Sequence, residues 1–168
     1  MREYFTEAVV LEKEPLREKD ARVVLFTPSL GKISAKVTSS RKITSKLSAH
    51  LEPLSISEVR LVEKGGFQVA DALCEKKLDA AHLPAARLIA GAFLEGAPDR
   101  RLYLALRNGE ATVPYIFEVL GLDLPGAACA SCEKRPSFFH LHDWMFACNE
   151  CLPHSHRNED WISVLNEA

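Results

Sequence analysis

The chain has 168 residues, of which 47% are hydrophobic and 26% charged, and its formal net charge is −2. This length allows one ordinary domain or two small ones, and the composition is typical of a globular protein rather than a disordered one. No apolar run approaches the roughly 18 residues that span a bilayer. Two acids also precede the first apolar stretch, so the sequence predicts neither a membrane segment nor a secretory signal and favours the cytoplasm.

Basic residues are concentrated in the first half of the chain. Residues 1–64 carry 12 Lys or Arg and 9 Asp or Glu, a net charge of +3, whereas residues 65–168 carry a net charge of −5. No acid lies between Asp20 and Glu52, a segment that holds Arg22, Lys32, Lys36, Arg41, Lys42 and Lys46. This asymmetry indicates a polyanionic partner, although a solvated basic face explains the charge alone equally well.

Five short strands are predicted at the start of the chain from β-prone apolar stretches between turn signals, and apolar residues alternate in the third and fourth of them. The strands are expected at residues 4–11, 21–27, 32–38, 54–63 and 67–73. A turn is predicted after the second strand and a Gly-Gly hairpin after the fourth. The alternation in the fourth strand slips near Glu58, which predicts a bulge there.

The third predicted strand carries part of the basic segment. Side chains repeat every two residues along a strand, so one face is expected to hold Ile33, Ala35 and Val37. The opposite face is then expected to hold Lys32, Ser34, Lys36 and Thr38. Residues 39–50 are polar and basic, and we expect them to form a mobile connection. Five strands with a longer connection between the third and fourth fit an OB-fold, and an SH3-like barrel fits the strand count almost as well.

Helices are predicted after the strands. They are expected at residues 84–95, at residues 100–107 behind an Asp99 cap, and at residues 113–120 behind a Thr112 cap. Leu102, Leu106 and either Leu104 or Tyr103 are expected to point inward, and residues 160–167 could form two further helical turns. The predicted fold class is therefore α+β, with a five-stranded barrel domain of the OB or SH3-like type at residues 1–78 and a small helical domain at residues 79–168 that would be marginal alone.

A pair of Cys-x-x-Cys motifs lies in the second half. Cys129 and Cys132 precede an aromatic, β-prone stretch of fifteen residues, and Cys148 and Cys151 follow it. Four thiolates brought together by a hairpin are typical of a structural zinc site, so we predict a zinc finger at residues 129–151. A thioredoxin-type redox pair needs only one such motif, which makes it the weaker reading.

Other candidate ligands are given lesser roles. His140, His142, His154 and His156 are expected to be solvated or to support the thiolates, since four sulfurs already complete the metal shell. Cys74 stands apart and is expected to be a small buried residue. A closed shell of four cysteines leaves no open position for catalysis, and no Walker loop, G-x-S-x-G or dinucleotide motif occurs. The sequence therefore predicts no enzyme.

The sequence also resembles the bacterial recombination mediator RecO family. The likeness lies in E-A-V-V-L at Glu7, in E-K-D-A-R-V-V-L-F-T-P-S-L-G-K from Glu18 to Lys32, and in L-E-P-L from Leu51 to Leu54. It continues in F-E-V-L-G-L-D-L-P ahead of Cys129-Ala-Ser-Cys and in the second cysteine pair. The resemblance covers residues 1 to about 152 and favours the OB-fold over the SH3-like barrel.

This resemblance implies a function and partners. The family binds single- and double-stranded DNA, anneals complementary strands, and works with RecR and the single-strand binding protein SSB to load RecA. Family members usually continue beyond the zinc finger with helices that contact SSB, whereas this chain ends at Ala168 and resembles a C-terminally truncated member. The resemblance therefore supports RecR as a partner more strongly than SSB.

The candidate DNA contacts follow from the basic segment. Arg22, Lys32, Lys36, Arg41, Lys42 and Lys46 are expected to hold backbone phosphates, which positions a strand without reading its sequence. Phe26 and Phe67 could stack on bases, but phenylalanine is more often buried in a protein core. Two other classes remain open: a module that binds RNA or the transcription or translation machinery, and a protein-interaction scaffold.

Overall fold

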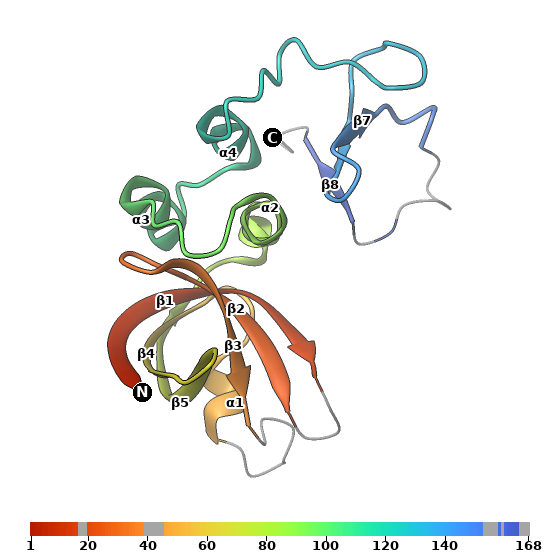
Figure 1. The fold of residues 1–168 in the computed structure, drawn as a ribbon. Helices are drawn as coiled ribbons and strands as arrows, with labels where there is room; N and C mark the ends of the chain where they lie inside the picture. Colours follow the sequence, from red (N-terminus) through yellow and green to blue (C-terminus); the bar gives the residue numbers. More distant parts are fainter. Residues whose placement is uncertain (17–19, 39–45, 153–157, 159, 165–168) are drawn as a thin grey trace. The chain divides into compact units, whose positions relative to one another are not determined.

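The computed structural model describes residues 1–16, 20–38, 46–152, 158 and 160–164 (Figure 1). The chain divides into two compact units, Met1–Ala111 and Thr112–Ala168. The first unit holds the five predicted strands and three of the described α-helices, whereas the cysteine motifs lie in the second. Among the described helices, none has the length and apolar character needed to cross a membrane.

The first unit is built on five strands that close on themselves. They are β1 (Arg2–Pro15), β2 (Ala21–Thr27), β3 (Gly31–Val37), β4 (Ser55–Glu63) and β5 (Phe67–Lys77). Their order in the closed barrel is β1-β2-β3-β5-β4, and β1 pairs antiparallel with both β2 and β4. The only parallel pairing among these strands joins β3 to β5. All five predicted strands are confirmed, with β1 and β5 longer than expected.

The barrel interior is filled by one side of each strand. Along β3, Ile33, Ala35 and Val37 are buried, as their spacing predicts. The wider cluster consists of small and branched apolar residues that fill the barrel: Ala8, Val10, Val23, Leu25, Ile33, Ala35, Val37, Leu51, Val59, Leu61, Val69 and Ala72. These aliphatic contacts supply the main favourable term for folding of the unit.

The bulges lie on a different strand from the one predicted. Pairing between β4 and β5 shifts at Ile56/Ser57 and again at Arg60/Leu61, and both shifts leave the extra residue on β5. Strand β4 itself pairs with β1 without interruption. An irregularity therefore does lie close to Glu58, but its extra residue is on β5 and not on β4. The alternation slips because Ser55, Ile56 and Ser57 are all buried at the start of β4, where Ser57 Oγ donates to the carbonyl of His50.

The connection between β3 and β4 contains a helix that the sequence reading missed. Residues 39–45 lie outside the described part of the chain, but Lys46–His50 form α1. The adjoining Leu51 is fully buried in the barrel core. Lys13 Nζ on β1 donates to both the carbonyl and the hydroxyl of Ser48, at 3.1 and 2.9 Å, which fixes the helix against the strand.

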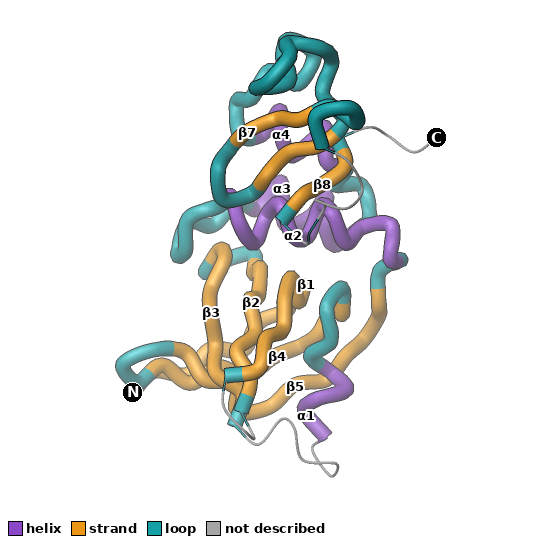
Figure 2. Tube along the Cα trace, turned by 90° about the vertical axis from the view of Figure 1, so that its right-hand side faces the viewer, coloured by secondary structure: helices purple, strands orange, loops and turns teal. Residues whose placement is uncertain are grey.

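Two further helices belong to the first unit and lie at the barrel end that carries the β2–β3 turn (Figures 1 and 2). A short 3₁₀ turn, η1 (Ala80–His82), leads into α2 (Leu83–Ala92), and α3 is Arg100–Asn108. Asp99 caps α3 by accepting from the Leu102 amide at 2.9 Å, as predicted. Tyr103 rather than Leu104 points inward, since Tyr103 is 2% exposed and Leu104 is 44% exposed.

The second unit consists of α4 (Val113–Val119) and three short strands, β6 (Phe138–His140), β7 (Met145–Ala147) and β8 (Trp161–Ser163). The strands form a sheet in the order β7-β6-β8. Thr112 caps α4 as predicted, and Phe117 of this helix packs on Phe139 with ring centroids 5.1 Å apart. The helical turns predicted from residue 160 are wrong for Trp161–Ser163, which pair antiparallel with β6 and bury Ile162. Residues 165–167 of that prediction lie outside the described part of the chain.

Candidate nucleic-acid interface and metal centre

One end of the barrel gathers three of its connections. The end of β1 pairs with the start of β2 at Pro15 and Ala21, and Ala21 in turn pairs with Val37 at the end of β3. Next to them, the β4–β5 hairpin begins at Glu63, which pairs with Phe67. The ends of β1, β3 and β4 therefore lie at the same end of the barrel.

A row of polar side chains crosses the outer surface near this end. The strand register places Glu14 opposite Arg22, Arg22 opposite Lys36, and Lys36 opposite Gln68. Side chains directly opposite each other on neighbouring strands lie close enough to interact. The structure thus brings together two of the six predicted DNA-binding residues, Arg22 and Lys36.

Both of these cations have acidic neighbours. Arg22 NH2 lies 2.7 Å from Glu14 Oε2, and Lys36 Nζ lies 2.9 Å from Asp20 Oδ2. The side chains of Arg22 and Lys36 are still 47% and 42% exposed. The Arg22–Glu14 pair is exposed on both sides and contributes only about 0.2–1 kcal/mol, so a phosphate could displace Glu14 at small cost. Asp20 is only 15% exposed and holds Lys36 in a more protected pair.

Lys32 is placed differently from the other predicted contacts. It is 9% exposed, and its Nζ donates at 2.6 Å to the carbonyl of Ala90 near the end of α2. Burial lowers the pKa of this amine, against the opposing influence of Glu95 and then Glu12. Lys32 therefore fastens α2 to the barrel. The alternation of the strand predicts that Lys32 shares an exposed face with Lys36, and this prediction is wrong for Lys32.

The remaining predicted cations are only partly described. Arg41 and Lys42 lie outside the described residues, and Lys46 is described only as the first residue of α1. Lys64 was missed by the sequence reading, although it is exposed in the β4–β5 hairpin. The sequence does place Lys64 in a hairpin, because it directly precedes Gly65-Gly66. Only the strand order shows that this hairpin lies at the same barrel end as the ends of β1 and β3.

The two aromatic candidates for base stacking belong to the interior. Phe26 is fully buried and packs on Tyr103 with ring centroids 6.2 Å apart. Phe67 is partly buried against the barrel core and meets Tyr4 edge-to-face at 5.8 Å. Phe26 therefore has no face open to a base, and Phe67 is partly covered by the barrel core.

The four cysteines of the paired motifs converge in the second unit. The Sγ atoms of Cys129, Cys132, Cys148 and Cys151 all lie within 4.8 Å of one another, and those of Cys132 and Cys148 are 3.5 Å apart. Tetrahedral zinc with sulfurs at about 2.3 Å requires sulfur–sulfur distances of about 3.8 Å. The four side chains therefore fit a tetrahedral metal ion with little movement.

Backbone hydrogen bonds shape the loops that carry these cysteines. The Glu133 amide donates to the Cys129 carbonyl at 2.9 Å, and the Leu152 amide donates to the Cys148 carbonyl at 3.0 Å. Amides of Ser131 and then Cys148 also point at the Cys129 sulfur and lower its thiol pKa to about 6. Neighbouring thiols, Cys132 foremost, raise the pKa of Cys151 to about 12. A bound cation would relieve the repulsion that keeps all four from ionising together.

Among the described residues, the cluster includes no histidine. His140 Nδ1 lies 2.9 Å from Asp143 Oδ2, and its ring packs on Trp161 at 4.6 Å. His142 Nε2 lies 3.4 Å from Asp160 Oδ1, whereas His154 and His156 lie outside the described residues. Cys74 stands apart from the cluster as expected, but it is only partly buried.

Comparison with known proteins identifies the N-terminal region. Residues 1–72 match the family model described as Recombination protein O N terminal. A protein named DNA repair protein RecO from Dehalococcoides mccartyi strain BAV1 is 46% identical over 59 residues, which is 35% of this chain and 23% of the relative. The protein of the same name from Thermodesulfovibrio yellowstonii is 38% identical over 61 residues, 36% of this chain and 24% of that relative.

These matches confirm the resemblance to the RecO family over the N-terminal region. The aligned segment spans about a quarter of the length of the curated relatives. The match of residues 1–72 to the family model contains β1 to β4 and the first part of β5, together with Arg22 and Lys36. The relatives are named DNA repair protein RecO, so DNA repair is the role to test for this chain.

Proposed function

We propose that the protein is a non-enzymatic DNA-binding mediator of recombination and DNA repair, and that its first unit is an OB-fold that holds DNA. The observation that carries this proposal is the match of residues 1–72 to the RecO N-terminal family. The strand order β1-β2-β3-β5-β4, with a helix between β3 and β4, supports an OB-fold over an SH3-like barrel.

DNA would lie across the barrel end that carries the connections after β1, β3 and β4. Arg22 and Lys36 would hold backbone phosphates there, together with Arg41, Lys42 and Lys46 from the same basic segment, and Lys64 is a further candidate. Such contacts are independent of base sequence and suit both single- and double-stranded DNA. Two strands whose phosphates are neutralised repel each other less, which favours annealing.

The four cysteines would hold a structural Zn²⁺ ion. Four sulfur ligands at tetrahedral spacing suit zinc and leave no position for a reactive water. The ion would fasten together the loops that precede β6 and follow β7 in a unit with little apolar core. We assign it no step in DNA binding or annealing.

Partners of the whole family enter as part of the same proposal. RecR would join this protein in loading RecA on single-stranded DNA, in the cytoplasm, whereas SSB is the less supported partner. Mixing the purified chain with RecR and measuring the mass of the complex tests whether the two proteins bind each other. A mass equal to the two separate proteins would remove RecR from the proposal.

The decisive experiment is a strand-annealing assay. Two complementary oligonucleotides with paired fluorophores are mixed with and without the full chain, and annealing is expected to become several-fold faster with it. A variant with Arg22→Glu and Lys36→Glu should lose most of this acceleration, while Arg100→Glu with Arg101→Glu, at two exposed positions on α3, serves as the matched control. An unchanged rate would overturn the proposal. Tighter binding of RNA than of the matched DNA oligomer would favour an RNA-binding module instead.

A further inference from the structure

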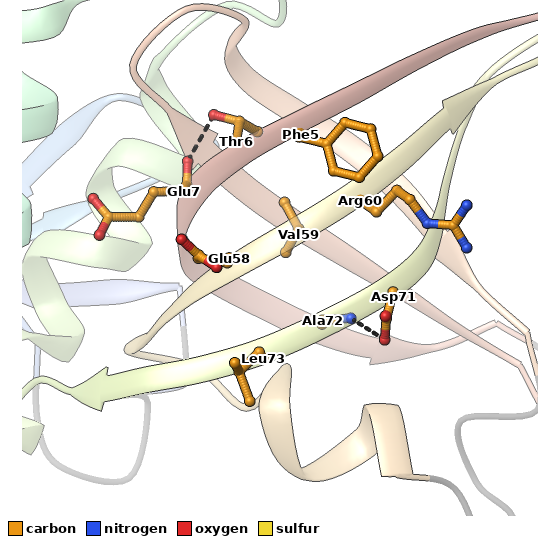
Figure 3. Close-up of a pocket in the computed structure, with 9 residues that line it drawn as sticks. All are labelled: Phe5, Thr6, Glu7, Glu58, Val59, Arg60, Asp71, Ala72 and Leu73. Atoms are coloured by element: carbon orange, nitrogen blue, oxygen red, sulfur yellow. Dashed lines mark hydrogen bonds between the residues drawn. The ribbon is translucent and has the colours of Figure 1, made fainter.

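A second surface of the barrel lies on the outer side of β1, β4 and β5. It is an open depression of about 500 Å³ whose lining includes Phe5, Glu58, Arg60, Asp71 and Leu73 (Figure 3). We refer to Phe5, Glu58, Asp71 and Leu73 as the acidic-apolar surface. The strand register arranges it in two adjacent rows, Phe5–Arg60–Asp71 and Glu7–Glu58–Leu73.

Two large apolar side chains of this surface face solvent. Phe5 is 76% exposed and Leu73 is 58% exposed, at opposite corners of the two rows. Strand alternation places both on the outer side, so neither can contribute to the barrel core. Single exposed apolar residues are ordinary, but two of them that flank a depression in the surface indicate an interaction site.

The charges of this surface are not balanced. Glu7 and Glu58 lie directly opposite each other on β1 and β4, and like charges in this position are destabilising. Glu7 is neutralised by Arg107 and receives a hydrogen bond from Tyr103. Within the described residues, no cation contacts Glu58, and Figure 3 shows Arg60 extending away from it toward the other end of the depression.

Asp71 adds a second carboxylate to the surface. Its Oδ1 accepts a hydrogen bond only from the adjacent amide of Ala72, at 2.9 Å, among the contacts described for this residue. The one cation that lines the depression, Arg60, lies 3.7 Å from Glu3 outside it. The depression therefore presents two carboxylates between two exposed apolar groups, and neither carboxylate forms an ion pair among the described contacts, although Arg60 lies opposite Asp71 in the strand register.

We propose that the acidic-apolar surface binds a protein partner through a peptide segment that carries basic side chains between apolar ones. The basic side chains would pair with Glu58 and Asp71, and the apolar ones would cover Phe5 and Leu73. DNA does not fit, because two carboxylates repel phosphates. A second copy of the same surface does not fit either, because the same carboxylates would face each other. A closed barrel also offers no free strand edge here, so recognition must rest on side chains.

This proposal stands apart from DNA binding by Arg22 and Lys36, and it is tested without DNA. The full ¹⁵N-labelled chain is titrated with a synthetic peptide that alternates leucine and lysine with serine spacers, and amide shifts are followed by NMR. The expected result is a saturable change centred on Phe5, Glu58, Asp71 and Leu73. The same peptide with glutamate for lysine, or with serine for leucine, should bind at least tenfold more weakly. Equal binding of all three peptides, or of none, would overturn the proposal.

Variants sharpen the result. Glu58→Lys should weaken peptide binding about tenfold while it removes the repulsion from Glu7, so the barrel stays folded, and Leu73→Ser should weaken it similarly. Glu110→Lys and Leu94→Ser are the matched controls, because Glu110 is exposed elsewhere in the first unit and Leu94 is 80% exposed. If a DNA oligomer rather than the peptide moves the Phe5 and Leu73 signals, or if Leu73→Ser abolishes dimers seen by light scattering, the surface has a different occupant.

Discussion

The carboxylate of Glu7 on β1 forms a hydrogen-bonded ion pair with the guanidinium of Arg107 on α3, 100 residues further along the chain. Arg107 Nε donates to Oε1 at 2.5 Å and NH2 donates to Oε2 at 2.9 Å. This bidentate geometry fixes the orientation of the carboxylate relative to the guanidinium. The hydroxyl of Tyr103 donates to the same Oε1 at 2.6 Å. These contacts join α3 to the barrel within the first unit, so α3 should unfold together with the strands.

The first prediction concerns this contact. Tyr103→Phe removes one hydrogen bond to a charged group without opening a cavity, so the free energy of unfolding should fall by about 1.5 kcal/mol. Urea denaturation followed by circular dichroism measures the change. Tyr115→Phe is the matched control, since no hydrogen bond of the Tyr115 hydroxyl is present among the described contacts, and it should change the free energy little. Equal effects of the two substitutions would contradict the role given to Tyr103.

The same contact predicts a dependence on pH. The hydrogen bond from Arg107 holds the pKa of Glu7 below its ordinary value of 4.5. A carboxyl with a lowered folded-state pKa stabilises the fold above its unfolded pKa, and this stability is lost as the pH falls through the folded value. The difference in unfolding free energy between the wild type and Glu7→Gln should therefore be constant near neutral pH and shrink below about pH 4.5. A difference that grew on acidification would refute the assignment.

The second prediction compares two glycines with the same backbone conformation. Gly31 has φ +68° and Gly65 has φ +67°, so alanine is strained equally at both. A Cβ at Gly31 would overlap the backbone of Ala97, whereas a Cβ at Gly65 meets nothing within 4 Å. Gly65→Ala should cost about 1 kcal/mol and Gly31→Ala at least about 2 kcal/mol more, because the 95–97 segment must move off β3. Similar melting temperatures for the two variants would contradict this close packing.

The third prediction concerns the cysteine cluster. Metal binding of this type supplies about 10–16 kcal/mol to folding, far more than the small apolar core around Phe117 and Phe139 can offer. Removing the metal with a chelator, or Cys148→Ser, should therefore unfold the second unit. Both tryptophans of the chain, Trp144 and Trp161, lie in this unit, so their fluorescence reports on it alone.

Controls separate the metal from a general loss of thiols. Cys74→Ser lies outside the cluster and should leave both tryptophan fluorescence and the metal content unchanged. Elemental analysis should find one zinc per chain in the wild type and none in Cys148→Ser. DNA binding should persist at least in part after chelation. Loss of DNA binding from a barrel that stays folded would move the cysteine-bearing loops from a structural role to a contact surface.

Much of the fold could be predicted because its signals are local. A continuous apolar, β-prone run defines β2 within its observed bounds, and the Gly65-Gly66 pair marks the β4–β5 hairpin. Capping residues such as Asp99 and Thr112 mark helix starts through hydrogen bonds to the next turn. The cysteine cluster was predictable for the same reason, since its spacing brings ligands together through two turns and a hairpin.

The missed features depend on tertiary contacts. α1 has five residues, too short for a helical period to be visible, and is held by Lys13 from a distant strand. Strand β8 has three residues that gain their conformation by pairing with β6. Lys32 alternates with apolar residues as Lys36 does, but only the packing of α2 decides that one is buried and the other exposed. The acidic-apolar surface likewise arises from strand pairing, which the sequence does not display.

The last prediction uses this difference between Lys32 and Lys36. Lys36→Met removes a phosphate contact, and at about 0.1 M salt the loss of one contact with single-stranded DNA should weaken binding about fivefold. Lys32→Met removes the hydrogen bond to the Ala90 carbonyl and should lower the free energy of unfolding by about 1 kcal/mol. Its DNA affinity should change less than about twofold, because the buried amine does not reach the surface.

Fluorescence anisotropy with a labelled oligonucleotide, repeated at several salt concentrations, measures both effects. With five phosphate contacts the wild type should show a log–log slope of about −3.5, which is a fall in affinity of about 100-fold between 50 and 200 mM salt. Lys36→Met should reduce this slope by about 0.7, whereas Lys32→Met should leave it unchanged. A reduced slope for Lys32→Met would mean that α2 lifts from the barrel when DNA binds and frees the amine for a phosphate. A slope near zero for the wild type would remove phosphate recognition from the proposed function altogether.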